Sequence, residues 1–116
     1  MEEINKILEK YNNFRYEQLR FIEQCADGSK IVTLVVVDED GEDEFSFKIE
    51  FTNVNSSKLI INSALQYLDM SSGITLIQEH GLYGFAIGSG SAMSHVQNAP
   101  VFIISSEIKI LEAIEL

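Results

Sequence analysis

The chain has 116 residues, 46% of them hydrophobic and 22% charged, which fits one globular domain and excludes a disordered or collagen-like chain. Its 18 acidic residues outnumber its 8 basic ones and give a formal net charge of −10. This charge repels nucleic acid and anionic membranes, so neither is expected as a direct partner, whereas a basic protein would be attracted.

The sequence favours a cytoplasmic protein. Cys25 is the only cysteine, so no internal disulfide can form. Residues 1–10 carry charge throughout and lack the basic and apolar regions of a secretory signal. The longest stretch without a charged residue, 81–106, is interrupted by glycine, serine, asparagine and proline, so it does not read as a membrane span.

The first segment predicts an amphipathic helix over residues 1–11. Apolar side chains recur there at helical spacing, at Ile4, Ile7, Leu8 and Tyr11. Two glutamates open the segment and Lys10 lies near its end, an arrangement that suits the helix dipole.

Three strands are expected next. Residues 16–25 and 30–37 flank Ala26-Asp27-Gly28-Ser29, which is typical of a hairpin turn. Residues 31–37 are nearly all β-branched and lack a polar face, which predicts a central strand covered on both sides. In the third strand Phe45, Phe47, Ile49 and Phe51 alternate with polar residues, so one face should be wet. The short connections favour an antiparallel meander.

The second half gives weaker signals. Residues 58–61 could form a short strand, but Ile61, Ala64, Leu65 and Leu68 have helical spacing and favour a short helix. Residues 74–78 and 82–87 predict another hairpin, and residues 101–104 and 108–111 two last strands. The glycine-rich segment 81–93 lacks a complete dinucleotide fingerprint and is interpreted as a flexible turn. The fold class is therefore α+β, with an N-terminal helix and a short middle helix on a mostly antiparallel sheet of six to seven strands.

No lysine or arginine occurs between Leu59 and Ile108. Either these residues are the more buried half of the sheet, or part of their surface is an oligomer interface, since charge is depleted in both settings. The two explanations stay open at this point.

The strongest candidate site is an acidic loop after the second strand. It fails the EF-hand pattern because Asp43 and Ile49 stand where glycine and glutamate are needed, so no metal is expected. One interpretation is a solvated hairpin tip, and the other is a charged finger that contacts a basic partner. The candidate contact residues are the six carboxylates Asp38, Glu39, Asp40, Glu42, Asp43 and Glu44.

Catalysis has little support in the sequence. His80, His95 and Cys25 lack zinc-site spacing, and nothing beside Cys25 would activate its thiol. We therefore expect no catalytic residue, metal or cofactor. An enzyme that uses Cys25 with His80 or His95 is kept as an alternative, and it would show fast alkylation of the thiol at neutral pH.

The order of features resembles small bacterial immunity proteins of contact-dependent growth inhibition and other polymorphic toxin systems. Four segments carry the resemblance: Tyr11-Asn12-Asn13-Phe14, Phe51-Thr52-Asn53-Val54, Gly73-Ile74 and Ser106-Glu107-Ile108. It implies a cytoplasmic inhibitor without catalysis that binds a cognate toxin domain, often a nuclease with a basic face.

The sequence thus predicts a noncatalytic immunity protein that neutralises a basic toxin domain through the acidic loop. The main alternative is a structural or oligomerisation module that self-associates through its neutral C-terminal half, for instance as a homodimer.

Overall fold

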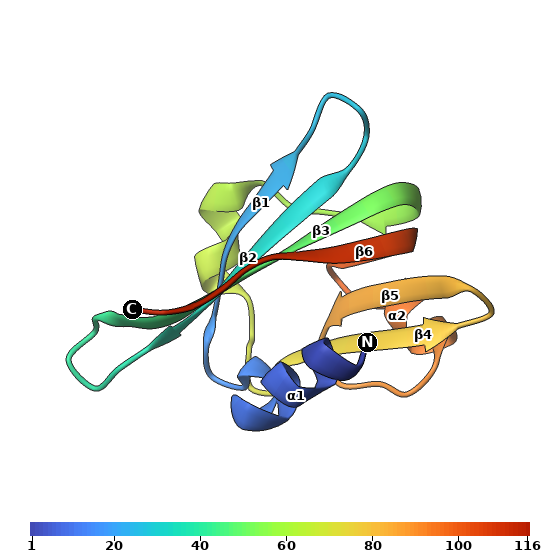
Figure 1. Ribbon diagram of the computed structural model, residues 1–116. Helices are drawn as coiled ribbons and strands as arrows, with labels where there is room; N and C mark the ends of the chain where they lie inside the picture. Colours follow the sequence, from blue (N-terminus) through green and yellow to red (C-terminus); the bar gives the residue numbers. More distant parts are fainter.

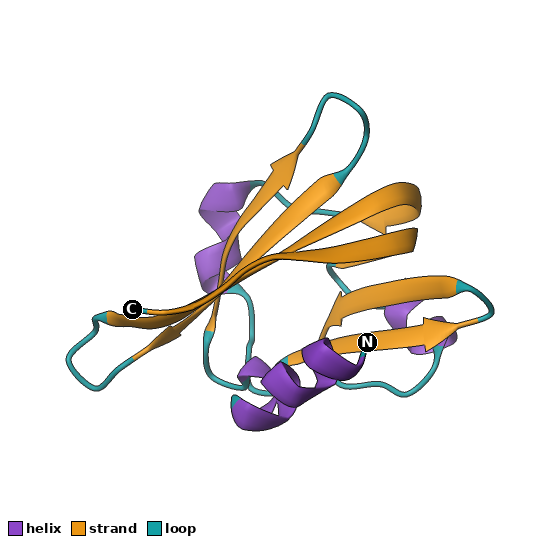
Figure 2. Ribbon diagram, in the orientation of Figure 1, coloured by secondary structure: helices purple, strands orange, loops and turns teal.

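The sheet in the computed structural model, which describes residues 1–116, has six strands in the order β1-β2-β3-β6-β5-β4, and every neighbouring pair is antiparallel (Figure 1). Helical segments lie beside it (Figure 2), which confirms the α+β class and the antiparallel sheet. The strands are β1 (Gln18–Gln24), β2 (Lys30–Val37), β3 (Asp43–Lys58), β4 (Ile74–Glu79), β5 (Leu82–Ile87) and β6 (Phe102–Glu115); the helical segments are α1 (Glu2–Lys10), η1 (Asn12–Phe14), η2 (Asn62–Tyr67) and α2 (Met93–Gln97).

The N-terminal helix is confirmed as α1, and its apolar stripe faces the core. Ile4 and Leu8 are buried in the main hydrophobic cluster. Beyond the helix, Tyr11 stacks on Phe45 with ring centroids 4.3 Å apart, and Phe14 stacks on Phe47 at 5.9 Å. These aromatic contacts attach the N-terminal segment to the third strand of the sheet.

The meander β1-β2-β3 is confirmed, but the two-sided cover predicted for residues 31–37 is wrong. Val32, Leu34 and Val36 belong to the main core, whereas Val35, although buried, lies outside both core clusters. Ile31, Thr33 and Val37 on the same side as Val35 are only half-buried. The outer face of β2 is thus only partly covered, so a β-branched run did not require a second covering layer.

The alternation predicted for β3 is confirmed. Phe45, Phe47, Ile49 and Phe51 are all buried in the main core, while Ser46, Lys48 and Glu50 between them are half-buried on the other face. β3 then continues to Lys58, farther than its alternating segment indicates, and the additional residues pair with the first part of β6.

The last strands are one element, which corrects the expectation of two. Residues 101–104 and 108–111 fall largely within the single strand β6, and the polar residues between them do not interrupt it. β6 pairs with β3 from Phe102 to Glu115 but with β5 only from Phe102 to Ser105. Its bulged pairing with β3 lets the sheet curl, and side chains from β2, β3, β4, β5 and β6 share one core.

The predictions for the segments that connect the strands are confirmed only in part. The short middle helix is confirmed as the 3-10 helix η2, which buries Leu65 and leaves Ile61 exposed. The segment 81–93, interpreted as a flexible turn, contains β5 and leads into α2, whose Val96 packs with Ala86, Ala99 and Ile104 in a second small cluster.

The stretch between Leu59 and Ile108, which has no lysine or arginine, contains all of β4, β5 and α2 and contributes to both core clusters. Its exposed positions are filled mainly by uncharged polar residues such as Ser63, Gln66, Ser71 and Asn98. Burial therefore accounts for part of the missing charge. No helix of the structure is long and apolar enough to span a bilayer.

Candidate functional site: the acidic end of the sheet

The six carboxylates from Asp38 to Glu44, here called the acidic tip, form the turn between β2 and β3 and the start of β3 (Figure 1). Asp38 shapes this turn rather than pointing freely outward. Its carboxylate oxygen Oδ1 accepts hydrogen bonds from the N–H groups of Asp40 and Glu42, each at 2.9 Å. The backbone of Asp38 also bonds to that of Glu42 at 2.8 Å, so the tip is held in a defined conformation.

Asp43 is the second tip residue with a structural role. Arg20 on β1 donates to both of its carboxylate oxygens, at 3.0 and 3.2 Å. These hydrogen bonds, together with the charge of the guanidinium, lower the pKa of Asp43. The pair is exposed and links the edge strand β1 to the tip.

The other four tip residues have no such engagement. Glu39, Asp40, Glu42 and Glu44 are exposed, and none of them takes part in an ion pair. Their charges therefore extend into solvent without a neutralising group.

Sequence reasoning missed two further acids that the sheet brings to this end. Glu112 on β6 accepts a hydrogen bond from the Ser46 hydroxyl at 2.9 Å. Glu115 lies opposite Phe45 in the pairing of β6 with β3 and forms an ion pair with Lys10 at 2.8 Å. The hydrogen bond to Lys10 lowers the pKa of Glu115, and the same contact raises that of Lys10. Only the length and the partner of β6 would have placed both acids here. We call the acidic tip together with Glu112 and Glu115 the acidic end.

The structure does not bring Cys25 together with either histidine. Cys25 directly follows β1 and donates weakly to Glu23 at 3.6 Å. His80 lies in the β4–β5 turn and His95 in α2, at another end of the molecule from the β1–β2 turn (Figure 1). No group of three or more His, Cys, Asp or Glu side chains is placed to hold a metal ion.

A hollow of about 580 Å³, here called the β1 groove, lies between β1 and the segment that contains η2. Residues 16–20 line one wall and residues between 62 and 71 the other. Hydrogen bonds join the walls at both ends. The Tyr16 N–H donates to the Met70 carbonyl at 2.8 Å, and the Asn62 side chain bonds to both backbone groups of Ile22, at 2.8 and 3.1 Å.

The β1 groove is continuous with the acidic tip. Arg20 lines the groove and pairs with Asp43 in the tip. Glu17 also lines the groove and accepts the N–H of Val37, the residue before the tip, at 3.3 Å. The groove and the tip therefore form one connected surface.

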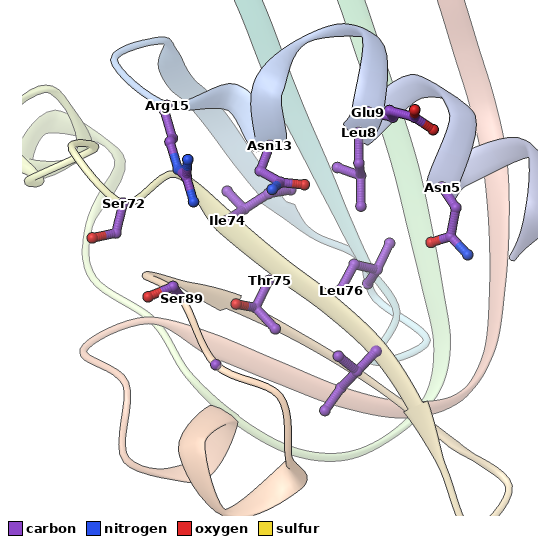
Figure 3. A pocket seen from close by; sticks show the side chains of 12 residues that line it. Asn5, Leu8, Glu9, Asn13, Arg15, Ser72, Ile74, Thr75, Leu76 and Ser89 are labelled. Carbon is purple, nitrogen blue, oxygen red and sulfur yellow. The ribbon is translucent and has the colours of Figure 1, made fainter.

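A second hollow of about 400 Å³ lies between α1 and β4 (Figure 3). Arg15 and Ser89 lie toward one end of it, and Asn5 and Glu9 project from α1 (Figure 3). β4 is an edge strand of the sheet and is uncharged from residue 74 to residue 78. This hollow thus borders a neutral sheet edge.

These features define an α+β domain on a curled antiparallel sheet, with one acidic end and a groove beside it. Comparisons with models of protein families, with curated proteins and with solved structures find no match.

Proposed function

We propose that this protein is a noncatalytic, cytoplasmic immunity protein that binds a basic toxin domain through its acidic end and neutralises it. A nuclease is the toxin class that suits this surface best. Its catalytic face must attract phosphates, and the same face attracts a row of carboxylates.

The observation that carries the proposal is the state of Glu39, Asp40, Glu42 and Glu44. All four are exposed and without ion-pair partners, on a turn that Asp38 and Asp43 hold in place. Like charges so close together repel one another, so this arrangement costs the isolated protein stability. A basic partner surface would turn that repulsion into attraction.

The proposed mechanism has two stages. At long range the net charge of −10, with its unpaired concentration at the tip, raises the rate of encounter with a basic surface. At short range a smaller desolvated set of contacts fixes the complex and covers the toxin's active face. The protein itself needs no reacting group for this inhibition.

Capture of partners from a lysate of the source cells tests the proposal. The bait is the tagged full chain, used at about 50 mM and about 300 mM salt, where screening differs strongly. We expect one basic protein to be retained at low salt and weakened at high salt. That protein should stop growth when expressed alone and should be harmless when this chain is co-expressed.

The decisive comparison is a variant that carries E39Q, D40N, E42Q and E44Q and keeps Asp38 and Asp43 to preserve the turn. Its control removes two charges elsewhere: it carries E2Q and E3Q on α1, exposed acids away from the tip. Capture and growth protection that are equal for the tip variant and the wild type would contradict the proposal.

A second candidate function is self-association along β4. It is favoured by the uncharged edge of this strand, because edges that must stay unpaired usually carry charges or proline. Light scattering tests this candidate. A dimer is supported if the wild type has a mass of twice 13.0 kDa and the variant I77K, which places a charge on β4, has a mass of 13.0 kDa. A single species of 13.0 kDa at high concentration would exclude it.

A further inference from the structure

We infer that the β1 groove receives an arginine-bearing loop of the basic partner, with the guanidinium held between Glu17 and Asp69. This inference rests on the proposed function, because it names the part of that partner which the groove recognises. The groove volume of about 580 Å³ lies within the range typical of ligand sites, roughly 300–1,000 Å³.

The groove brings two carboxylates to one of its ends from different walls. Glu17 follows Tyr16, and Asp69 precedes Met70, so both flank the hydrogen bond that joins Tyr16 to Met70. Neither acid forms an ion pair with a lysine or arginine of this chain. Their partners within the chain are uncharged hydrogen-bond donors: the Val37 N–H for Glu17, and the N–H and hydroxyl of Ser71 for Asp69.

The one cation in the groove does not satisfy these acids. Arg20 donates to Gln18 at 2.7 and 3.0 Å and to Asp43 at 3.0 and 3.2 Å. Its guanidinium is therefore already occupied by Gln18 and Asp43. The groove as a whole is complementary to a positive charge from outside the chain.

Two exposed tyrosines favour a guanidinium over an ammonium group. Tyr16 lines the groove and is 81% exposed, and Tyr67, between the groove residues Gln66 and Leu68, is also 81% exposed. A planar guanidinium stacks on aromatic rings and binds carboxylates in a fork, whereas a lysine ammonium does neither as well.

Tyr16 is moreover a residue that folding alone does not favour. Its φ of 62° lies in the left-handed region, which is unfavourable for a tyrosine, and its exposed ring adds little to the core. Asparagine adopts this conformation more readily. A tyrosine here is better explained by contact with a partner than by stability.

Titration of the labelled full chain by NMR tests the inference with the blocked peptide Ser-Gly-Arg-Gly-Ser. The same peptide with citrulline in place of arginine is neutral and has nearly the same shape, and a lysine version keeps only the charge. We expect shift changes at residues 16–20 and 62–71, and binding that weakens by at least about fivefold for the citrulline peptide and less for the lysine peptide.

Two variants complete the test. E17Q together with D69N keeps both backbone hydrogen bonds and should weaken binding of the arginine peptide by at least about fivefold, whereas the E2Q/E3Q control should not. Y16N should also weaken binding while the free energy of unfolding is unchanged or higher. A merely structural tyrosine would show the opposite.

Equal binding of the arginine and citrulline peptides, shift changes confined to other regions, no binding at all, or full binding by E17Q/D69N would each overturn the inference. These outcomes are distinct from failure of the proposed function. If the tip variant no longer captures the partner and the arginine peptide does not bind at the groove, only the groove inference fails. If the tip variant still captures the partner, the proposed function fails.

Discussion

Single residues hold the N-terminal segment against the sheet, and Gly73 is the most constrained of them. Its φ is +68°, and a Cβ at this position would lie 2.1 Å from the Asn13 carbonyl oxygen. Asn12, Asn13, Phe14 and Tyr16 also have positive φ, so this crossing combines an unusual backbone with close approach. Only a residue without a side chain fits opposite Asn13.

We predict that G73A lowers the free energy of unfolding by about 2–4 kcal/mol, from the left-handed backbone and the clash together. Urea denaturation measures this. G28A is the control, because Gly28 has φ +89° but open space around it, and should cost only about 1 kcal/mol. Equal costs for the two variants would show that the contact with Asn13 is not constraining.

Two hydrogen-bonded aspartates, Asp27 and Asp43, should make the stability of the fold sensitive to acid. The Ser29 hydroxyl and N–H lower the pKa of Asp27, and the hydrogen bonds from Arg20 lower that of Asp43, in both cases from 3.8. A carboxyl whose pKa is lower in the folded state stabilises the fold above the unfolded pKa, and this stabilisation is lost as the pH falls through the folded pKa.

The free energy of unfolding should therefore fall as the pH is lowered below about 4. D27N keeps the oxygen that accepts from Ser29 but cannot be protonated, so its loss in acid should be smaller than that of the wild type. D40N is the control, because the Asp40 carboxylate accepts no hydrogen bond in the structure. Identical acid profiles for D27N and the wild type would contradict this account.

At the scale of elements, the two faces of β3 should contribute very differently to stability. Phe47 is fully buried and stacks with Phe14, while Ser46 is half-buried on the opposite face. F47A should cost about 3–5 kcal/mol, because it leaves a cavity among aromatic side chains.

S46A should change the free energy of unfolding little, since its hydroxyl meets only Glu112 near the surface. Chemical denaturation of both variants makes the comparison. A small cost for F47A would mean that the core can refill the space, and a large cost for S46A would mean that the outer face is more important than its exposure indicates.

The sequence predicted the elements whose pattern is local. The apolar stripe at Ile4 and Leu8, the Asp27-Gly28 turn and the alternation from Phe45 to Phe51 each lie within a few residues, and each is confirmed. Long-range pairing was not predictable in this way. β6 is continuous through Ser105, Ser106 and Glu107 because β3 pairs along it, although serine and glutamate are typical of strand ends.

The same limit applies to the candidate site. The acidic tip is contiguous in sequence, so its six residues could be named in advance, although their role in partner binding stays a prediction. Glu112 and Glu115 join it only through the register of β6 with β3. The β1 groove depends on Asn62 and Met70 bonding to residues forty or more positions earlier, which no local pattern indicates.

At the scale of the whole molecule, the curled sheet gathers acidic residues at one end. The acidic tip and the far end of β6 lie together beside the C-terminus, whereas β4 and β5 form the neutral part of the molecule (Figure 1). Under the proposed function, this uneven charge would orient a basic partner before contact, and the β1 groove, which adjoins the tip, lies where that partner would arrive.

The central claim is that unpaired charge at the acidic tip drives partner association. The most direct measurement is the association rate constant of the captured basic partner with the wild type, the E39Q/D40N/E42Q/E44Q variant and the E2Q/E3Q control, at about 50 mM and about 300 mM salt. We predict that the tip variant associates about tenfold more slowly at low salt, that the control resembles the wild type, and that the difference narrows at high salt. Rate constants for the tip variant that equal those of the wild type at both salt concentrations would contradict the claim.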